Sequence, residues 1–153
     1  MSFWQWWQSE GQSEQEASTD SQMTLGGSSD LLPTDERVDG ATIRKRFTKA
    51  IQDNGGSKKA QQMATEAESQ ALFDCTTAEL YERTGGNRRK GRRTLPSAIQ
   101  EGYLVNESIC ANHLEGRVGS IGGDTQGEVD GAIASEVDAK TRENRGLGLF
   151  RWS

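Results

Sequence analysis

Residues 76–114, TTAELYERTGGNRRKGRRTLPSAIQEGYLVNESICANHL, decide the fold. The stretch begins with the pattern of a capping box, in which the Thr76 hydroxyl accepts the amide of Glu79 while the Glu79 carboxylate reaches back to the amide of Thr76. A glycine pair that starts at Gly85 ends this helix, because a residue without Cβ takes the left-handed conformation that satisfies the last carbonyls. The pattern therefore predicts a short helix over 77–84, followed by a basic loop.

A long apolar helix is expected after the basic loop, over 95–115. Thr94 is a suitable N-cap, and Pro96 is tolerated in the first turn, where its missing N–H has no intrahelical partner. Apolar side chains then recur mostly at helical spacing, which predicts the most buried helix of the chain. They are Ile99, Tyr103, Ile109, Cys110 and Leu114.

Two further helices are predicted upstream, over 41–53 and 58–73. The first places Ile43, Phe47 and Ile51 on one face, while four cations, Arg44, Lys45, Arg46 and Lys49, point elsewhere. We interpret these cations as a solvated outer face, with a second phosphate-contacting surface as the alternative. The second helix has a narrow stripe of small residues. The chain is therefore predicted to be all-α, a small bundle of about four helices in a helical domain over 41–116.

The segments that flank this domain are more polar. Residues 1–40 contain one basic and eight acidic residues and are rich in Ser, Gln and Gly after a Trp-rich start, so we expect them to be disordered. Residues 117–127 read as a Gly-rich linker. Within 128–153, a weak helix over 128–143 and an aromatic tail complete the chain. The net charge of −5 thus combines a basic centre with acidic or neutral ends.

The basic loop is the strongest candidate site in the sequence. Its cations repel one another unless an anion lies against them, and each phosphate that they neutralise releases counterions and adds salt-sensitive affinity. The alternative is a solubilising loop that pairs with the acidic N-terminal segment. The candidate nucleic-acid-binding residues are Arg83, Arg88, Arg89, Lys90, Arg92 and Arg93.

Aromatic side chains gather at both ends of the chain. Three of the four tryptophans lie within the first seven residues, and a second aromatic group ends the chain. These ends are suited either to docking on a partner or to packing on the protein's own surface. Contact with a membrane is a third interpretation, which the lack of basic residues near the N-terminal tryptophans disfavours. The candidate partner-binding residues are Phe3, Trp4, Trp6, Trp7, Leu149, Phe150 and Trp152.

The sequence contains no catalytic pattern that we could assign. The glycines around the basic loop lack the spacing of a Walker phosphate loop. Cys110 and His113 are interpreted as core or boundary residues rather than a nucleophile and base, and Cys75 as a reduced core cysteine. We therefore expect a non-enzymatic protein without cofactor or metal. No run of about 18 apolar residues and no signal peptide is present, so a cytoplasmic location is expected.

The runs LFDCTTAELYERTGG and GRRTLPSAIQEGYLVNESICANHLE resemble the C-terminal region of DNA-damage-inducible protein D and related proteins of bacterial mobile elements. The upstream run FTKAIQDNGGSKKAQQMAT fits the same arrangement loosely, so that the resemblance covers about residues 43–115. The N-terminal antirepressor-like domain of that family has no counterpart here. The resemblance implies a role in the DNA-damage response or in a mobile element, through contact with nucleic acid or a nucleoprotein filament.

Two functions remain open, with a self-associating structural protein as a weaker third option. The first is an accessory protein that contacts nucleic acid or a nucleoprotein filament through the basic loop. The second is an adaptor or inhibitor that docks on another protein through the aromatic ends. The first predicts binding with a steep salt dependence. The second predicts loss of function when either end is removed.

Overall fold

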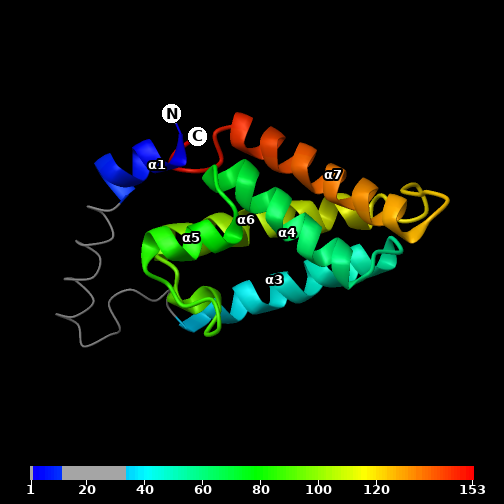
Figure 1. Ribbon diagram of the computed structural model, residues 1–153, viewed down its shortest axis with the longest axis horizontal. Coiled ribbons are helices and arrows are strands. Elements are labelled where there is room, and N and C mark those ends of the chain that lie inside the picture. The colour runs from blue at the N-terminus through cyan, green and yellow to red at the C-terminus, as the bar shows by residue number, and fades with distance from the viewer. Residues whose placement is uncertain (1, 12–33) are drawn as a thin grey trace.

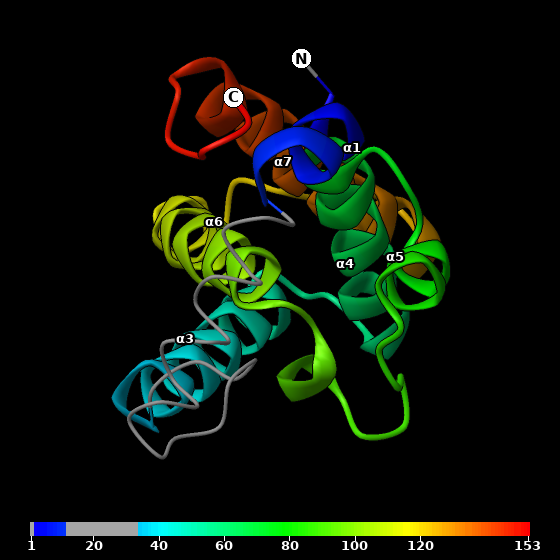
Figure 2. The same ribbon diagram turned by 90° about the vertical axis from the view of Figure 1, so that its left-hand side faces the viewer.

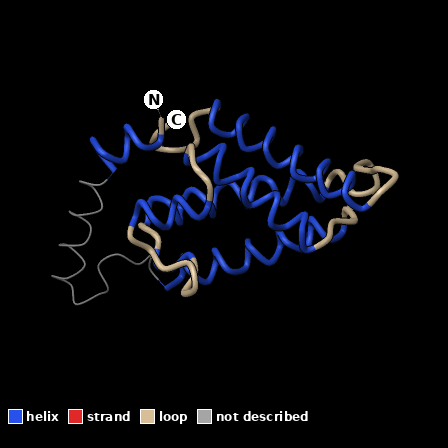
Figure 3. Tube along the Cα trace, viewed as in Figure 1, coloured by secondary structure: helices blue, strands red, loops and turns tan. Residues whose placement is uncertain are grey.

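The computed structural model describes residues 2–11 and 34–153, and all regular structure in this part of the chain is helical (Figures 1 and 3). The all-α prediction is confirmed, whereas the count of about four helices is only approximate, since the described residues form six α-helices. In chain order the elements are α1 (Phe3–Trp6), a π-helical turn (Trp7–Gly11), α3 (Thr34–Asp53), α4 (Lys58–Phe73), α5 (Thr77–Thr84), a 3₁₀ turn (Arg92–Thr94), α6 (Ser97–Glu115) and α7 (Gln126–Gly146).

The predicted capping box at the start of α5 is confirmed. The Thr76 hydroxyl accepts a hydrogen bond of 3.2 Å from the Glu79 amide, and the Thr76 amide donates one of 3.3 Å to the Glu79 carboxylate. At the other end of the helix, Gly85 has a φ of 74°. A side chain at that position would strain the backbone, which explains why the helix ends on a glycine.

The start of α6 differs from the prediction that Thr94 would cap it. Pro96 is the N-cap residue, and Thr94 belongs to the preceding 3₁₀ turn. The Thr94 hydroxyl donates to the Gly91 carbonyl at 2.8 Å and accepts the amide of Asn87 at 2.9 Å. It therefore closes the basic loop onto itself instead of beginning the helix.

The long helices pack in pairs. Helix α7 lies along α4 and α3 lies along α6, while α6 also contacts α7 (Figure 2). We expected the helical domain to end at residue 116, with only a weak helix after the Gly-rich linker. In the structure α7 is an integral member of the bundle, because Ile133 and Val137 enter the core and three buried polar side chains, Asp130, Thr141 and Asn144, extend the same face.

The two ends of the described chain meet at one end of the bundle (Figure 1). The expected disorder of residues 1–40 does not hold for residues 3–11 and 34–40, which are helical, and residues 12–33 lie outside the described residues. The Ser2 hydroxyl accepts the Gln5 amide at 3.2 Å and so caps α1. The Phe3 ring lies 5.0 Å from the Trp152 ring, centroid to centroid. The aromatic start thus folds back onto the aromatic tail.

A buried polar layer divides the core into two apolar clusters. One cluster, at the end where the termini meet, contains Phe73, Leu80 and Trp152; the other contains Phe47 and Ile51. Along α4 and α6, buried polar residues come between the residues of the two clusters, and on α7 they follow Ile133 and Val137 of the second cluster. This layer consists of Glu68 on α4, Asn106 and Glu107 on α6, and Thr141 and Asn144 on α7.

Candidate nucleic-acid interface

One end of the basic loop is fixed to the polar layer through Arg92. Its two Nη atoms donate hydrogen bonds of 2.8 Å to the two carboxylate oxygens of Glu107. The guanidinium also lies 3.8 Å from the centroid of the Tyr103 ring, a cation–π contact. The Glu107 side chain is 1% exposed, so this pair is largely withdrawn from water. Such a bidentate pair holds the loop in one orientation, because both hydrogen bonds require the same guanidinium plane.

Arg44 on α3 provides Glu107 with a second cationic partner. Its Nη1 lies 2.6 Å from a Glu107 oxygen, and its Nη2 donates to the Thr65 hydroxyl at 2.8 Å. Burial opposes ionisation of Glu107, but the charge of Arg92 and then that of Arg44 outweigh it and hold the pKa of this carboxyl below its usual value. The interpretation of Arg44 as part of a solvated outer face is therefore wrong, because its side chain reaches from α3 to Glu107 on α6 and Thr65 on α4.

Glu68 is fully buried beside this charged group and behaves differently. Burial, and after it the negative charge of Glu107, raise the pKa of Glu68 well above its usual value. The amide of Asn106 donates to Glu68 Oε1 at 3.1 Å, whereas no donor among the described residues reaches Oε2. The raised pKa favours the protonated form of this carboxyl, which avoids a second negative charge beside Glu107.

Further hydrogen bonds connect the polar layer across the bundle. Asn106 also donates to the Thr141 hydroxyl at 3.0 Å and accepts from the Asn144 amide at 3.0 Å. On the other side, the Tyr103 hydroxyl lies 2.6 Å from that of Ser69. The layer thus joins α4, α6 and α7 by directional bonds, and a shift in helix register would leave buried polar groups without partners.

The loop between Gly86 and Thr94 is held by its own hydrogen bonds. The Asn87 carboxamide oxygen accepts the amide of Arg89 at 3.0 Å, and the Asn87 carbonyl accepts the amide of Gly91 at 3.1 Å. Gly91 has a φ of 86°, a conformation that an L side chain rarely adopts. Together with Thr94 and Arg92, these contacts give the loop a defined shape before any ligand binds.

The six cations predicted to bind nucleic acid divide into two groups. Arg92 is committed to Glu107, and Arg83 lies 3.6 Å from Glu79 and stacks over the Trp4 ring at 4.9 Å. The other four are exposed, and none forms an ion pair with a carboxylate within the part of the chain that the structure describes. These four, here called the loop cations, are Arg88, Arg89, Lys90 and Arg93.

The aromatic ends lie mostly in the core. Phe3 and Trp6 are buried, Trp7 is nearly so, and the Trp152 indole donates to the Leu72 carbonyl at 3.0 Å. Phe150 is also buried, whereas Leu149 is 45% exposed and Trp4 is partly buried. Of the interpretations considered, packing on the protein's own body is the one that the structure shows for these side chains. None of the described helices is long and apolar enough to cross a membrane.

Cys110 and His113 do not approach each other as a nucleophile and base. Burial raises the pKa of the Cys110 thiol to about 12, and its sulfur lies 3.8 Å from the Thr141 hydroxyl. The His113 imidazole instead lies 2.7 Å from a carboxylate oxygen of Glu136 on α7. A protonated thiol in the core has no nucleophilic role at neutral pH. Cys75 is likewise buried, and it forms no disulfide.

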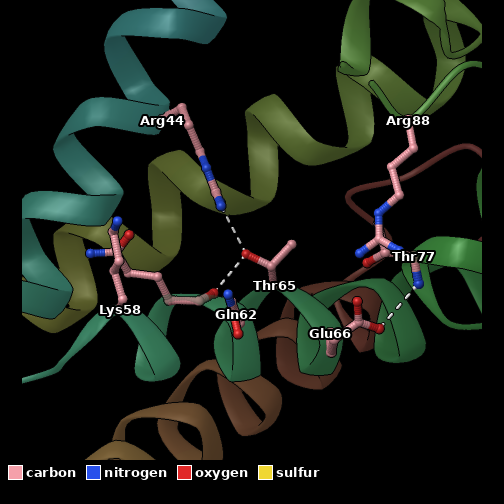
Figure 4. Close-up of a pocket in the computed structure, with 8 residues that line it drawn as sticks. Arg44, Lys58, Gln62, Thr65, Glu66, Thr77 and Arg88 are labelled. Carbon is pink, nitrogen blue, oxygen red and sulfur yellow. Dashed lines mark hydrogen bonds between the residues drawn. The ribbon is translucent and has the colours of Figure 1, made fainter. Parts of the chain in front are cut away.

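A polar groove lies beside the basic loop, between α3, α4 and α5 (Figure 4). Its volume is about 350 Å³, and every side chain that lines it is polar or charged. In Figure 4, Arg44 and Arg88 reach toward α4 from two different segments. The lining residues are Arg44, Lys58, Gln61, Gln62, Thr65, Glu66, Thr77 and Arg88.

The inward-facing charges were missed from the sequence, although weak signals were present. Glu68 follows Ala60 and Ala64 at helical spacing, and Glu107 lies in the most apolar helix of the chain. A charged residue in such a stripe indicates a buried partner, since an unpaired buried charge is costly. The cationic partners of Glu107 could not be predicted from the sequence, because Arg44 and Arg92 are distant from it along the chain and approach it only in the folded bundle.

Comparisons with known proteins do not add to this description: no family model, no curated protein and no solved structure matches the chain. The class that the fold defines is an all-α bundle with a buried polar layer and an exposed basic loop. The resemblance to DNA-damage-inducible protein D stays a prediction.

Proposed function

We propose that this chain binds the phosphate backbone of nucleic acid through its basic loop. The observation that carries the proposal is that the four loop cations are exposed and lack carboxylate partners among the described residues. Elsewhere on the described surface, cations are commonly paired, as Arg46 is with Glu115 at 2.5 Å and Arg142 with Asp138 at 3.1 Å. An unpaired set of cations on one loop is suited to a polyanion.

The shape of the loop also supports the proposal. Arg92 and Thr94 fix the end of the loop. Ligand binding therefore costs this loop less conformational entropy than it would cost a flexible loop. No aromatic side chain belongs to the loop, so stacking of bases is not expected there. The expected binding is therefore electrostatic, with little sequence preference and a strong dependence on salt.

The acidic segment within residues 1–40 is a possible competitor for the loop. Its residues 12–33 lie outside the described residues, and pairing between this segment and the loop stays a prediction. The link to a DNA-damage response or a mobile element also stays a prediction, since it rests on the resemblance alone.

The proposal is tested by fluorescence anisotropy of a labelled single-stranded oligonucleotide titrated with the whole chain at low and moderate salt. A variant with all four loop cations changed to Gln should lose most of the salt-sensitive binding. The matched control removes four cations that have carboxylate partners elsewhere, namely Arg46, Lys49, Lys140 and Arg142. Equal loss of binding in both variants would indicate a response to net charge alone, and no binding by the wild type at low salt would overturn the proposal.

A further inference from the structure

We infer that the polar groove between α3, α4 and α5 binds a phosphate monoester, such as the terminal phosphate of the nucleic acid that the basic loop holds. This inference rests on the proposed function, because Arg88 belongs to both the loop and the groove. The basic loop by itself would bind any phosphate backbone, whereas the groove would prefer a terminal phosphate.

The charges around the groove favour an anion. Lys58 and Arg88 are exposed and have no carboxylate partner in the described parts of the chain. Arg44 does have one, but it shares Glu107 with Arg92, so two guanidinium groups face one carboxylate. Burial, and after it the charge of Glu107, raise the pKa of Glu68 behind them, which favours the neutral form of that carboxyl. The inner wall of the groove therefore keeps an excess of positive charge.

The single carboxylate that lines the groove already has a hydrogen-bond donor. Glu66 accepts the amide of Thr77 at 3.1 Å and so holds the start of α5. The remaining lining side chains are amides and hydroxyls, of which Gln62 and Thr65 lie on α4. The Thr65 hydroxyl already donates to the Gln61 carbonyl at 2.8 Å, so the neutral donors for phosphate or sugar oxygens are the side-chain amides of Gln61 and Gln62. The absence of an aromatic side chain among the lining residues disfavours stacking of a base.

A terminal phosphate fits this site better than an internal one for two reasons. A monoester carries about −1.5 to −2 charges at pH 7, and it presents three acceptor oxygens. An internal phosphodiester has a single charge and only two free oxygens. The three cations are spread along the groove, with Lys58 at one end, Arg88 at the other and Arg44 between them (Figure 4), and their combined charge favours the more highly charged monoester.

The experiment compares a 3′-labelled single-stranded oligonucleotide with and without a 5′-phosphate, in the anisotropy assay and with the whole chain. The wild type should bind the phosphorylated form roughly tenfold more tightly, the effect expected of one charge-assisted hydrogen bond. Lys58→Gln should abolish this preference while leaving binding of the unphosphorylated oligonucleotide nearly unchanged, because Lys58 lies outside the loop. Lys59→Gln is the matched control, since Lys59 is the next residue of α4, is also exposed and does not line the groove.

Titration with adenosine 5′-monophosphate, followed by isothermal calorimetry, distinguishes a free mononucleotide from a strand end. Binding that Lys58→Gln removes and Lys59→Gln retains supports the groove, even if the oligonucleotide does not bind and the proposed function fails. A wild type that binds both oligonucleotides equally and does not bind the mononucleotide overturns the groove site alone. Binding of neither an oligonucleotide nor the mononucleotide overturns both proposals.

Discussion

Arg92 and Glu107 face each other through two parallel hydrogen bonds of 2.8 Å, one to each carboxylate oxygen. Arg92 lies near the end of the basic loop, while Glu107 lies in the middle of α6, buried in the polar layer. This pair therefore connects the exposed charges of the basic loop with the interior of the protein. It also separates the cations of the loop by role, because Arg92 positions the loop and its exposed neighbours remain free for a ligand.

We expect Arg92→Ala to destabilise the protein by about 3 kcal/mol, because it leaves Glu107 buried with only Arg44 as a cationic partner. The measurement is urea unfolding followed by tryptophan fluorescence. The control is Arg93→Ala, which removes the same charge from an exposed neighbour and should change the free energy of unfolding by no more than about 0.5 kcal/mol. Equal effects of the two substitutions would show that the Arg92–Glu107 pair adds nothing to stability.

The raised pKa of Glu68 predicts a pH dependence of stability. A carboxyl whose pKa is higher in the folded state than in the unfolded state contributes stability below the unfolded pKa, and this contribution is lost as the pH rises toward the folded pKa. Each unit of difference corresponds to about 1.4 kcal/mol. Glu68→Gln keeps the shape but cannot ionise, so its stability should fall less than that of the wild type between about pH 5 and 8. The check is urea unfolding across this range, and parallel curves for the two proteins would contradict the assignment of a neutral Glu68.

The aromatic tail is predicted to stabilise the fold rather than to bind a partner. Trp152 is 4% exposed, and its ring lies 5.5 Å from that of Phe73, centroid to centroid. Trp152→Ala should cost about 3–5 kcal/mol through loss of this packing. Leu149→Ala alters an exposed side chain in the same tail and should cost no more than about 0.5 kcal/mol. Thermal unfolding followed by circular dichroism separates these outcomes, and a Trp152→Ala protein as stable as the wild type would argue for a surface role of the tail.

Two helical glycines should respond in opposite directions to the same substitution. A Cβ at Gly102 would lie 2.9 Å from a carbon of the Trp152 ring and 3.2 Å from one of Phe73, so Gly102→Ala should destabilise the protein by about 1–3 kcal/mol. A Cβ at Gly131 on α7 would meet nothing within 4 Å, so Gly131→Ala should stabilise it by up to about 1 kcal/mol. Unfolding in urea measures both. A stabilised Gly102→Ala variant would show that the rings of Trp152 and Phe73 shift at little cost to make room for the added Cβ.

The local features of the chain were largely predictable because they depend on neighbouring residues. The capping box of Thr76 and Glu79, the glycine end of α5 at Gly85 and the bounds of the central helices follow from hydrogen bonds within a few residues. The position of the basic loop was also predictable, since a glycine turn and a run of cations identify it. The role of each cation in the loop was not.

By itself, the sequence determined the helical class, the order of the central helices and the existence of a basic loop, because caps, glycines and helical periodicity act over short distances. Only the tertiary structure decided which charges turn inward and which remain exposed. Arg92 meets Glu107 across 15 residues, Arg44 meets it across 63, and Phe3 meets Trp152 from the other end of the chain. Contacts of this kind depend on how helices pack, and helix packing places residues side by side irrespective of their distance in sequence.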